Sequence, residues 1–139
     1  MMERLATIVE TMRAPRVLII GDIMVDRYIR GSVERISPEA PIQILKARSR
    51  DERLGGAANV AQNAAAIDGR VSCIGVVGDD QEGAAATALC RLKRINPLFV
   101  RERGRPTILK TRFVDHHQQM LRVDREETSP IAPETERKG

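Results

Sequence analysis

The sequence predicts an α/β fold, on three observations. Two branched apolar runs, 16–21 and 71–77, show no polar alternation, which is typical of strands buried on both faces of a parallel sheet. An Ala-rich helical stretch at 57–67 separates them, and a second helical pattern follows at 79–95, so the strand–helix–strand–helix order favours parallel βαβ units. Aromatic residues make up only 2% of the chain. The core must therefore be built from Ala, Val, Ile and Leu, which lets helices approach a sheet closely.

The helices carry recognisable boundary signals. Residues 3–13 place apolar side chains at helical spacing, and Pro15 ends that pattern. Gly69 closes the Ala-rich helix. Asp79 followed three residues later by Glu82 has the spacing of a capping box, which predicts a helix running to about Ile95. A third short strand is expected at 99–101.

Two pairs of half-exposed strands are predicted beside the main sheet. Each pair flanks a segment that cannot be helical or buried: a Pro-rich loop in the first pair and a polar turn in the second. We expect the two pairs to form a flap next to the sheet. The predicted strands are 24–31 and 42–46 around the loop 37–41, and 107–114 and 118–124 around the turn 115–117.

Composition argues against several classes of function. The net charge of +4 is spread along the chain and aromatic residues are scarce, which disfavours a nucleic-acid-binding surface. No apolar stretch approaches the roughly 18 residues of a membrane span, and residues 1–14 are too charged for a signal peptide, so we expect a cytoplasmic protein without a membrane partner. Cys73 and Cys90 are expected to be small buried hydrophobes. The adjacent His116 and His117 would point to opposite faces of a strand, so we predict no metal site.

The glycine pair Gly55-Gly56 is the strongest local signal. Adjacent glycines directly before a helix let the backbone approach a ligand closely, with helix N–H groups facing it. Asn59, in the first turn of that helix, can both donate to and accept from a sugar hydroxyl. A tight turn that only packs the helix on the sheet explains the same pattern equally well.

Asp22 and Asp26 form a second candidate site. Asp22 comes directly after a predicted parallel strand, at the edge where open α/β sheets bind ligands. In a strand that continued past Gly21, the two carboxylates would share a face and could hold vicinal hydroxyls. The alternative is that Asp22 caps a turn and Asp26 is simply solvated.

Taken together, six motifs in chain order resemble the N-terminal part of the ribokinase (PfkB) family of carbohydrate kinases, and within it the D-glycero-β-D-manno-heptose-7-phosphate kinases. The likeness runs from about residue 16 to the last residues. The motifs are Gly21-Asp-x-Met-x-Asp26, Arg35-Ile-Ser-Pro-Glu-Ala-Pro41, Arg53-x-Gly-Gly-Ala-Ala-Asn-Val-Ala61, Gly78-Asp-Asp-x-x-Gly83, Pro106-Thr-Ile-x-Lys110-x-Arg112 and Gln118-Gln-x-Leu-Arg-x-Asp124.

The resemblance implies a ribokinase-like three-layer α/β/α domain, truncated here, with a small β-lid at about 24–54 and 105–125 that covers the sugar and forms a homodimer contact. It implies that sugar hydroxyls are bound by Asp26, Gly55, Gly56 and Asn59, with Asp22 as a further candidate.

The resemblance also makes Lys110, Arg112 and Arg122 candidates for the substrate's own phosphate. Lys110 and Arg112 are two apart and share a strand face, which agrees with this role. Arg122 belongs with them only if the hairpin register places it opposite Lys110. A solvated strand face with no ligand is the alternative for all three residues.

In the same family, the ATP-binding half and a Gly-Ala-Gly-Asp motif with the catalytic base follow this region, and neither is present in residues 1–139. We therefore predict a sugar-binding part without a catalytic residue of its own, which works with ATP and Mg²⁺ only in a longer enzyme. The alternatives are another sugar kinase of the family, a non-catalytic sugar-binding or dimerising module, or a chain too incomplete to fold stably, since a sheet cut within a domain leaves an unpaired edge and an uncovered apolar face.

Overall fold

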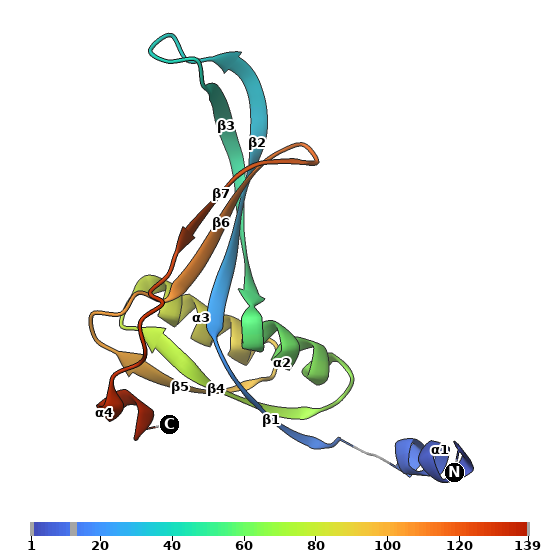
Figure 1. Ribbon diagram of the computed structural model, residues 1–139. Helices are drawn as coiled ribbons and strands as arrows, with labels where there is room; N and C mark the ends of the chain where they lie inside the picture. The colour runs from blue at the N-terminus through green and yellow to red at the C-terminus, as the bar shows by residue number, and fades with distance from the viewer. Residues whose placement is uncertain (1, 12–13, 139) are drawn as a thin grey trace.

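The computed structural model describes residues 2–11 and 14–138, and it confirms the α/β class (Figure 1). The strands form two separate sheets, one of three strands in the order β1-β4-β5 and one of four in the order β3-β2-β6-β7. The elements are α1 (Met2–Thr11), β1 (Arg16–Ile20), β2 (Ile23–Ile36), β3 (Gln43–Gly55), α2 (Gly56–Ala66), β4 (Arg70–Gly78), α3 (Gln81–Leu92), β5 (Asn96–Glu102), β6 (Ile108–Asp115), β7 (Gln118–Arg125) and α4 (Pro133–Glu136).

The three-stranded sheet is parallel throughout, as predicted. We use the name body for this sheet together with α2 and α3. Small side chains bring the helices onto one face of this sheet. Both cysteines are fully buried there, which confirms their expected role, and burial raises the pKa of the Cys90 thiol to about 11. The buried residues of this core include Ala58, Ala61, Val71, Cys73, Val77, Ala86 and Cys90.

The opposite face of the body sheet is largely uncovered in the part of the chain that the structure describes. Leu18, Ile20 and Leu98 are 57%, 70% and 46% exposed on it. The segment 126–136, with the one-turn helix α4, passes over part of this face and leaves a cleft of about 700 Å³. The described residues thus supply the sheet and one helical layer of the three layers expected.

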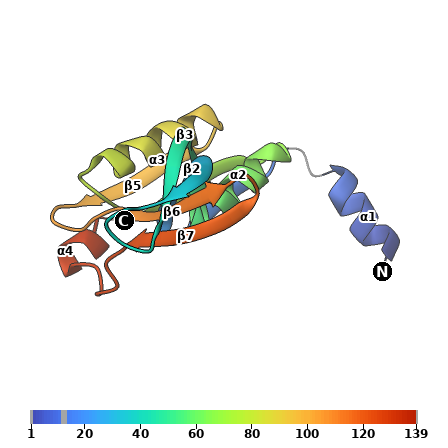
Figure 2. The same ribbon diagram turned by 90° about the horizontal axis from the view of Figure 1, so that it is seen from above.

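The N-terminal helix α1 lies apart from both sheets in both views (Figure 1 and Figure 2). Its apolar Leu5 and Ile8 are 55% and 51% exposed, so the predicted amphipathic helix forms but its apolar side is not packed on the body. Met12 and Arg13, the end of the predicted helix, lie outside the described residues. None of the helices in 2–11 and 14–138 is long and apolar enough to cross a membrane.

The four-stranded sheet, which we call the lid, rises away from the body (Figure 1). Strands β2 and β3 form a long antiparallel hairpin closed by the Pro-containing loop 37–42, β2 runs parallel to β6, and β6 turns back into β7 at 116–117. The strands β2 and β3 are longer than predicted: the sequence analysis missed 32–36 of β2 and 47–55 of β3, and each of these segments pairs with the predicted part of the other strand. Val25, Leu54 and Leu109 anchor the base of the lid in the core, each at most 7% exposed.

Three further expectations about element boundaries are wrong. Helix α3 is capped by Asp80 rather than Asp79: the Asp80 carboxylate accepts a hydrogen bond from the Gly83 N–H, 2.8 Å away. The helix ends at Leu92 instead of continuing to Ile95. The strand that was to carry both Asp22 and Asp26 is broken at 21–22, where the chain leaves the body sheet and enters the lid.

Candidate functional site

The junction between β3 and α2 is built around Gly55 and Gly56. A Cβ on Gly55 would lie 2.7 Å from Oδ2 of Asp26 and equally close to Cγ of Met24, so only a glycine fits beside that carboxylate. Gly56 has a φ of +56°, and a Cβ there would lie 2.4 Å from the carbonyl oxygen of Asp22. The glycine pair therefore allows a close approach of the backbone to Asp26, Met24 and Asp22 of the same chain, as a tight turn requires. The approach of a ligand to this backbone stays a prediction.

Asp22 and Asp26 have different surroundings. The Asp22 side chain is exposed, while its carbonyl oxygen accepts a hydrogen bond from the Ala57 N–H at 2.9 Å and so ties the start of the lid to α2. The Asp26 side chain is partly buried on the lid and accepts a hydrogen bond from Arg112 of β6. Asn59 lies exposed in α2, one turn beyond the glycine pair.

The face of the lid that carries Asp26 also carries the three predicted cations. Cross-strand partners share a face, and the register pairs Asp26 with Lys110, Lys110 with Asp124, and Arg112 with Arg122. The condition set for Arg122 is not met, because Arg122 stands opposite Arg112 rather than Lys110. Arg122 nevertheless lies on the same face of the lid as the other two cations. We call this surface the polar lid face.

Each predicted cation on the polar lid face has an acidic partner. Lys110 Nζ lies 3.2 Å from Asp124 Oδ2 and 3.4 Å from Glu126 Oε2, and Arg122 Nε lies 3.0 Å from Asp124 Oδ1. The hydrogen bond to Asp124 raises the pKa of Lys110, so this amine stays charged. An arriving anion would find these cations already oriented by their carboxylate partners.

The sequence analysis missed the surroundings of Tyr28, two residues after Asp26 on the same face. The guanidinium carbons of Arg30, Arg53 and Arg112 lie 4.9, 5.0 and 5.3 Å from the centre of its ring. Arg53 also binds Asp51 across a 2.8 Å ion pair. The period-two alternation of residues 26, 28 and 30 was the signal that could have found this cluster.

Comparison with known proteins decides the family. The model of the family described as pfkB family carbohydrate kinase matches residues 14–138, nearly the whole chain. The chain belongs to the pfkB carbohydrate kinase family. Solved structures agree on a ribokinase-like fold: a carbohydrate kinase from Agrobacterium tumefaciens has a TM-score of 0.67 at 20% identity over 80% of this chain and 35% of that one. Ribokinase from Arabidopsis thaliana, complexed with ribose and ATP, has a TM-score of 0.61 at 20% identity over 80% of this chain and 36% of its own.

The curated relatives of this pfkB chain are considerably longer. It is 48% identical over 124 residues to the bifunctional protein HldE of Paramagnetospirillum magneticum, which covers 88% of this chain and 25% of that protein. It is 45% identical over 118 residues to the D-beta-D-heptose 7-phosphate kinase of Bordetella bronchiseptica, covering 85% of this chain and 38% of that protein. The resemblance inferred from the six motifs is thus confirmed, for a chain that spans about a quarter to two-fifths of these relatives.

The described residues of this pfkB chain contain no group of three His, Cys, Asp or Glu side chains that could hold a metal ion. The N-terminus of α3 is no free phosphate cradle either, because Asp80 already binds the Gly83 N–H there.

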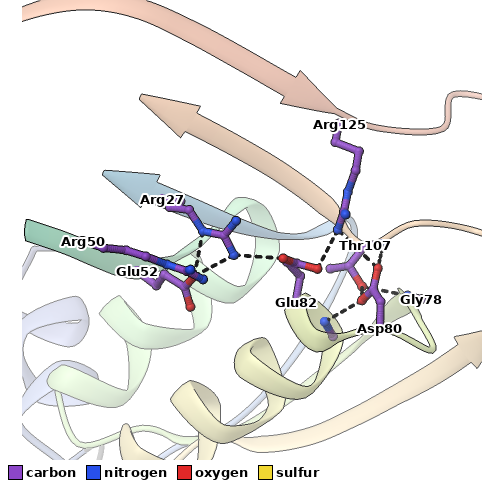
Figure 3. A network of polar contacts seen from close by, with 9 residues as sticks. Arg27, Arg50, Glu52, Gly78, Asp80, Glu82, Thr107 and Arg125 are labelled. Carbon is purple, nitrogen blue, oxygen red and sulfur yellow. Dashed lines mark hydrogen bonds and ion pairs between the residues drawn. The ribbon is translucent and has the colours of Figure 1, made fainter. Parts of the chain in front are cut away.

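A second polar cluster, on the back of the lid, joins it to α3 (Figure 3). Glu82 lies between Arg27 of β2 and Arg125 of β7, and it is 8% exposed. Next to it, Asp80 accepts hydrogen bonds from the Thr107 N–H at 2.9 Å and the Thr107 hydroxyl at 2.6 Å. The predicted capping box between Asp79 and Glu82 is therefore wrong: Asp80 caps the helix, and Glu82 binds the two arginines of the lid.

Proposed function

We propose that this chain is the sugar-binding part of an ATP-dependent heptose 7-phosphate kinase. One observation carries the proposal: Asp26, pressed against Gly55, shares the polar lid face with Lys110, Arg112 and Arg122. A carboxylate beside a glycine turn suits sugar hydroxyls, and guanidinium and ammonium groups suit a phosphate. The names of the relatives, HldE and D-beta-D-heptose 7-phosphate kinase, support the same substrate.

The proposed roles follow from where each group lies. Asp26 accepts hydrogen bonds from the sugar hydroxyls, the glycine pair lets the sugar ring approach the backbone, and Asn59 contacts a further hydroxyl from α2. Arg112 lies between the two ends of the substrate, since it binds Asp26 and stands opposite Arg122. The exposed carboxylate of Asp22 is a peripheral candidate at the same junction.

The parent reaction we propose transfers the γ-phosphoryl group of ATP to the anomeric hydroxyl, which gives heptose 1,7-bisphosphate, a precursor of the lipopolysaccharide core, in the cytoplasm. Mg²⁺ neutralises charge on the transferred group in such reactions. This chain supplies part of the substrate positioning, and the ATP site and the general base belong to a longer enzyme. By itself the purified chain should show no ATP-dependent turnover of heptose 7-phosphate, and measurable turnover would contradict that division of roles.

The lid also carries the proposed homodimer contact. Leu121 and Val123 of β7 are 56% and 49% exposed on the back of the lid. A second lid packed against these apolar side chains would remove them from water. Sedimentation of the wild-type chain and of a Leu121→Lys variant tests this contact, and equal monomer fractions would argue against it.

Calorimetric titration with heptose 7-phosphate, and with the same heptose lacking the phosphate, tests the substrate assignment. We expect the chain to bind the phosphorylated sugar more tightly, and the double variant Lys110→Glu/Arg112→Glu to lose that preference. The matched control reverses two exposed charges on the body, Arg91→Glu/Lys93→Glu. If the lid variant binds heptose 7-phosphate as the wild type does, the phosphate role is wrong and another sugar kinase of the family becomes the better explanation.

A further inference from the structure

Glu82 holds two strands of the lid at once. Its Oε1 accepts a hydrogen bond from Arg27 Nη2 of β2 at 2.9 Å, and its Oε2 accepts one from Arg125 Nη2 of β7 at 2.6 Å. Glu82 belongs to the first turn of α3, so both contacts run from the body to the lid (Figure 3). A charged, nearly buried carboxylate with one arginine on each oxygen is a strong and directional link.

The link extends to a third strand and to the helix cap. Arg27 Nε also donates to Glu52 Oε1 of β3 at 2.8 Å, and Arg125 Nη2 lies 3.4 Å from Oδ2 of Asp80. Three lid strands, β2, β3 and β7, are thereby joined to one helical turn. We call Arg27, Glu52, Asp80, Glu82 and Arg125 the latch.

The two arginines of the latch are direct sequence neighbours of residues on the polar lid face. Arg27 follows Asp26 on β2, and Arg125 follows Asp124 on β7, so in each pair one side chain points to the front of the lid and the other to the back. Asp26 binds Arg112, and Asp124 binds Lys110 and Arg122. Fixing the two arginines from behind therefore fixes the backbone that places both front carboxylates.

We propose that Glu82 is a positioning residue: from the first turn of α3 it sets the angle of the lid, and with it the placement of Asp26 beside the glycine turn and of Asp124 on the polar lid face. The part of this inference that concerns substrate rests on the function proposed above. The lid's other anchors, Val25, Leu54 and Leu109, are apolar and lie at its base, so they hold the lid in place without directing its tilt. Arg27 and Glu52 of the latch lie two residues farther along their strands than Val25 and Leu54, where they resist tilting. Arg125 stands opposite Leu109 and ties the edge strand β7 to α3 at the base of the lid.

A distance measurement between spin labels tests the latch without any substrate. Labels at Ala47→Cys, on the exposed part of β3, and Leu92→Cys, at the exposed end of α3, report the angle between lid and body. The native cysteines, both 0% exposed, stay unlabelled. We expect Glu82→Gln to broaden the distance distribution, and Arg125→Gln, at a half-exposed position that cannot disrupt the core, to broaden it as well.

The matched control is Asp79→Asn, which removes a neighbouring carboxylate that binds Arg101 within the body at 2.8 Å. This control should leave the distribution as narrow as in the wild type. An unchanged distribution in Glu82→Gln would overturn the proposal, and so would equal broadening in Glu82→Gln and Asp79→Asn, since the effect would then come from a loosened helix start.

Binding of heptose 7-phosphate by the same variants adds a second readout. Loss of one charged hydrogen bond of the latch should weaken binding by about tenfold in Glu82→Gln, with no change in Asp79→Asn. Unchanged affinity together with a broadened distribution would overturn the link to substrate. If the wild-type chain itself does not bind heptose 7-phosphate, the proposed function fails, while the distance measurement still decides whether Glu82 positions the lid.

Discussion

Arg112 of β6 reaches diagonally across the polar lid face and donates to the carboxylate of Asp26 on β2. The contact joins the group proposed to bind sugar hydroxyls to a group proposed to bind the substrate's phosphate. It also raises the pKa of Arg112, since the bound form of the cation is the charged one. The hydrogen bond thus fixes the two ends of the proposed substrate site relative to each other.

The first prediction concerns Asp26. Replacing it by Asn keeps the shape but removes the charge that strengthens hydrogen bonds from sugar hydroxyls, and it leaves Arg112 without its anionic partner. We expect Asp26→Asn to weaken the binding of heptose 7-phosphate by about tenfold or more. Calorimetric titration measures the loss. Asp51→Asn, on the same face but paired with Arg53, is the control and should bind nearly as the wild type does.

The second prediction concerns Gly55, whose φ of −118° is accessible to any residue. The added methyl group of Gly55→Ala would overlap the Asp26 carboxylate and the Met24 side chain, each 2.7 Å from the new Cβ. We expect sugar binding to fall sharply because Asp26 must move. Gly104→Ala provides the comparison: a Cβ there meets no atom within 4 Å, so any loss in that variant reports only the backbone strain at its φ of +84°. Titration with heptose 7-phosphate should separate the two variants, and equal affinities would show that Asp26 tolerates the displacement.

The body of the fold could be predicted from the sequence because its signals are local. The apolar runs of β1 and β4 and the glycine boundaries of α2 mark buried strands and helices without any knowledge of their partners. The lid was harder to predict from the sequence. Residues 32–36 of β2 and 47–55 of β3 are rich in charged side chains and were not predicted as strand, and each of these segments pairs with the predicted part of the other strand.

Candidate site residues could be predicted where short motifs identify them. Contacts that depend on the register between strands could not. Gly55, Asp26 and the cations of β6 were found from motifs, but the pairing of Arg122 with Arg112 depends on a hairpin register that no short motif fixes. Glu82 was assigned to a capping box because its spacing from Asp79 fits one. Its real partners, Arg27 and Arg125, lie 55 and 43 residues away in the sequence.

The third prediction concerns the helix cap. Asp80→Ala removes the acceptor for the Gly83 N–H, and it also leaves two donors of Thr107, which is 1% exposed, without their partner. Loss of an N-cap together with an unsatisfied buried group should lower the free energy of unfolding by roughly 2–4 kcal/mol. Urea unfolding followed by circular dichroism measures this. Asp79→Ala, which loses only an exposed ion pair, should change stability by less than about 0.5 kcal/mol.

The last prediction concerns pH. Burial by itself would raise the pKa of Glu82, but hydrogen bonds from Arg125 and Arg27 outweigh it and hold the pKa below its ordinary value. The pKa of Asp80 is lowered in the same way: burial alone would raise it, but hydrogen bonds from Thr107 and Gly83 outweigh that effect. A carboxyl whose pKa is lower in the folded state binds its proton more readily when unfolded. Its contribution is therefore complete above the unfolded pKa, about 4 for both groups, and is lost as the pH falls through the folded value.

Urea midpoints measured from pH 7 down to pH 3 should accordingly stay level at first and then fall below about pH 5. The fall should be shallower in Glu82→Gln, because the protonation-linked part of its stability is gone at every pH. Asp79→Asn should retain the slope of the wild type. If Glu82→Gln lowers stability by the same amount at pH 7 and at pH 3, the carboxylate contributes through packing alone, and the charged contacts to Arg27 and Arg125 do not hold the lid.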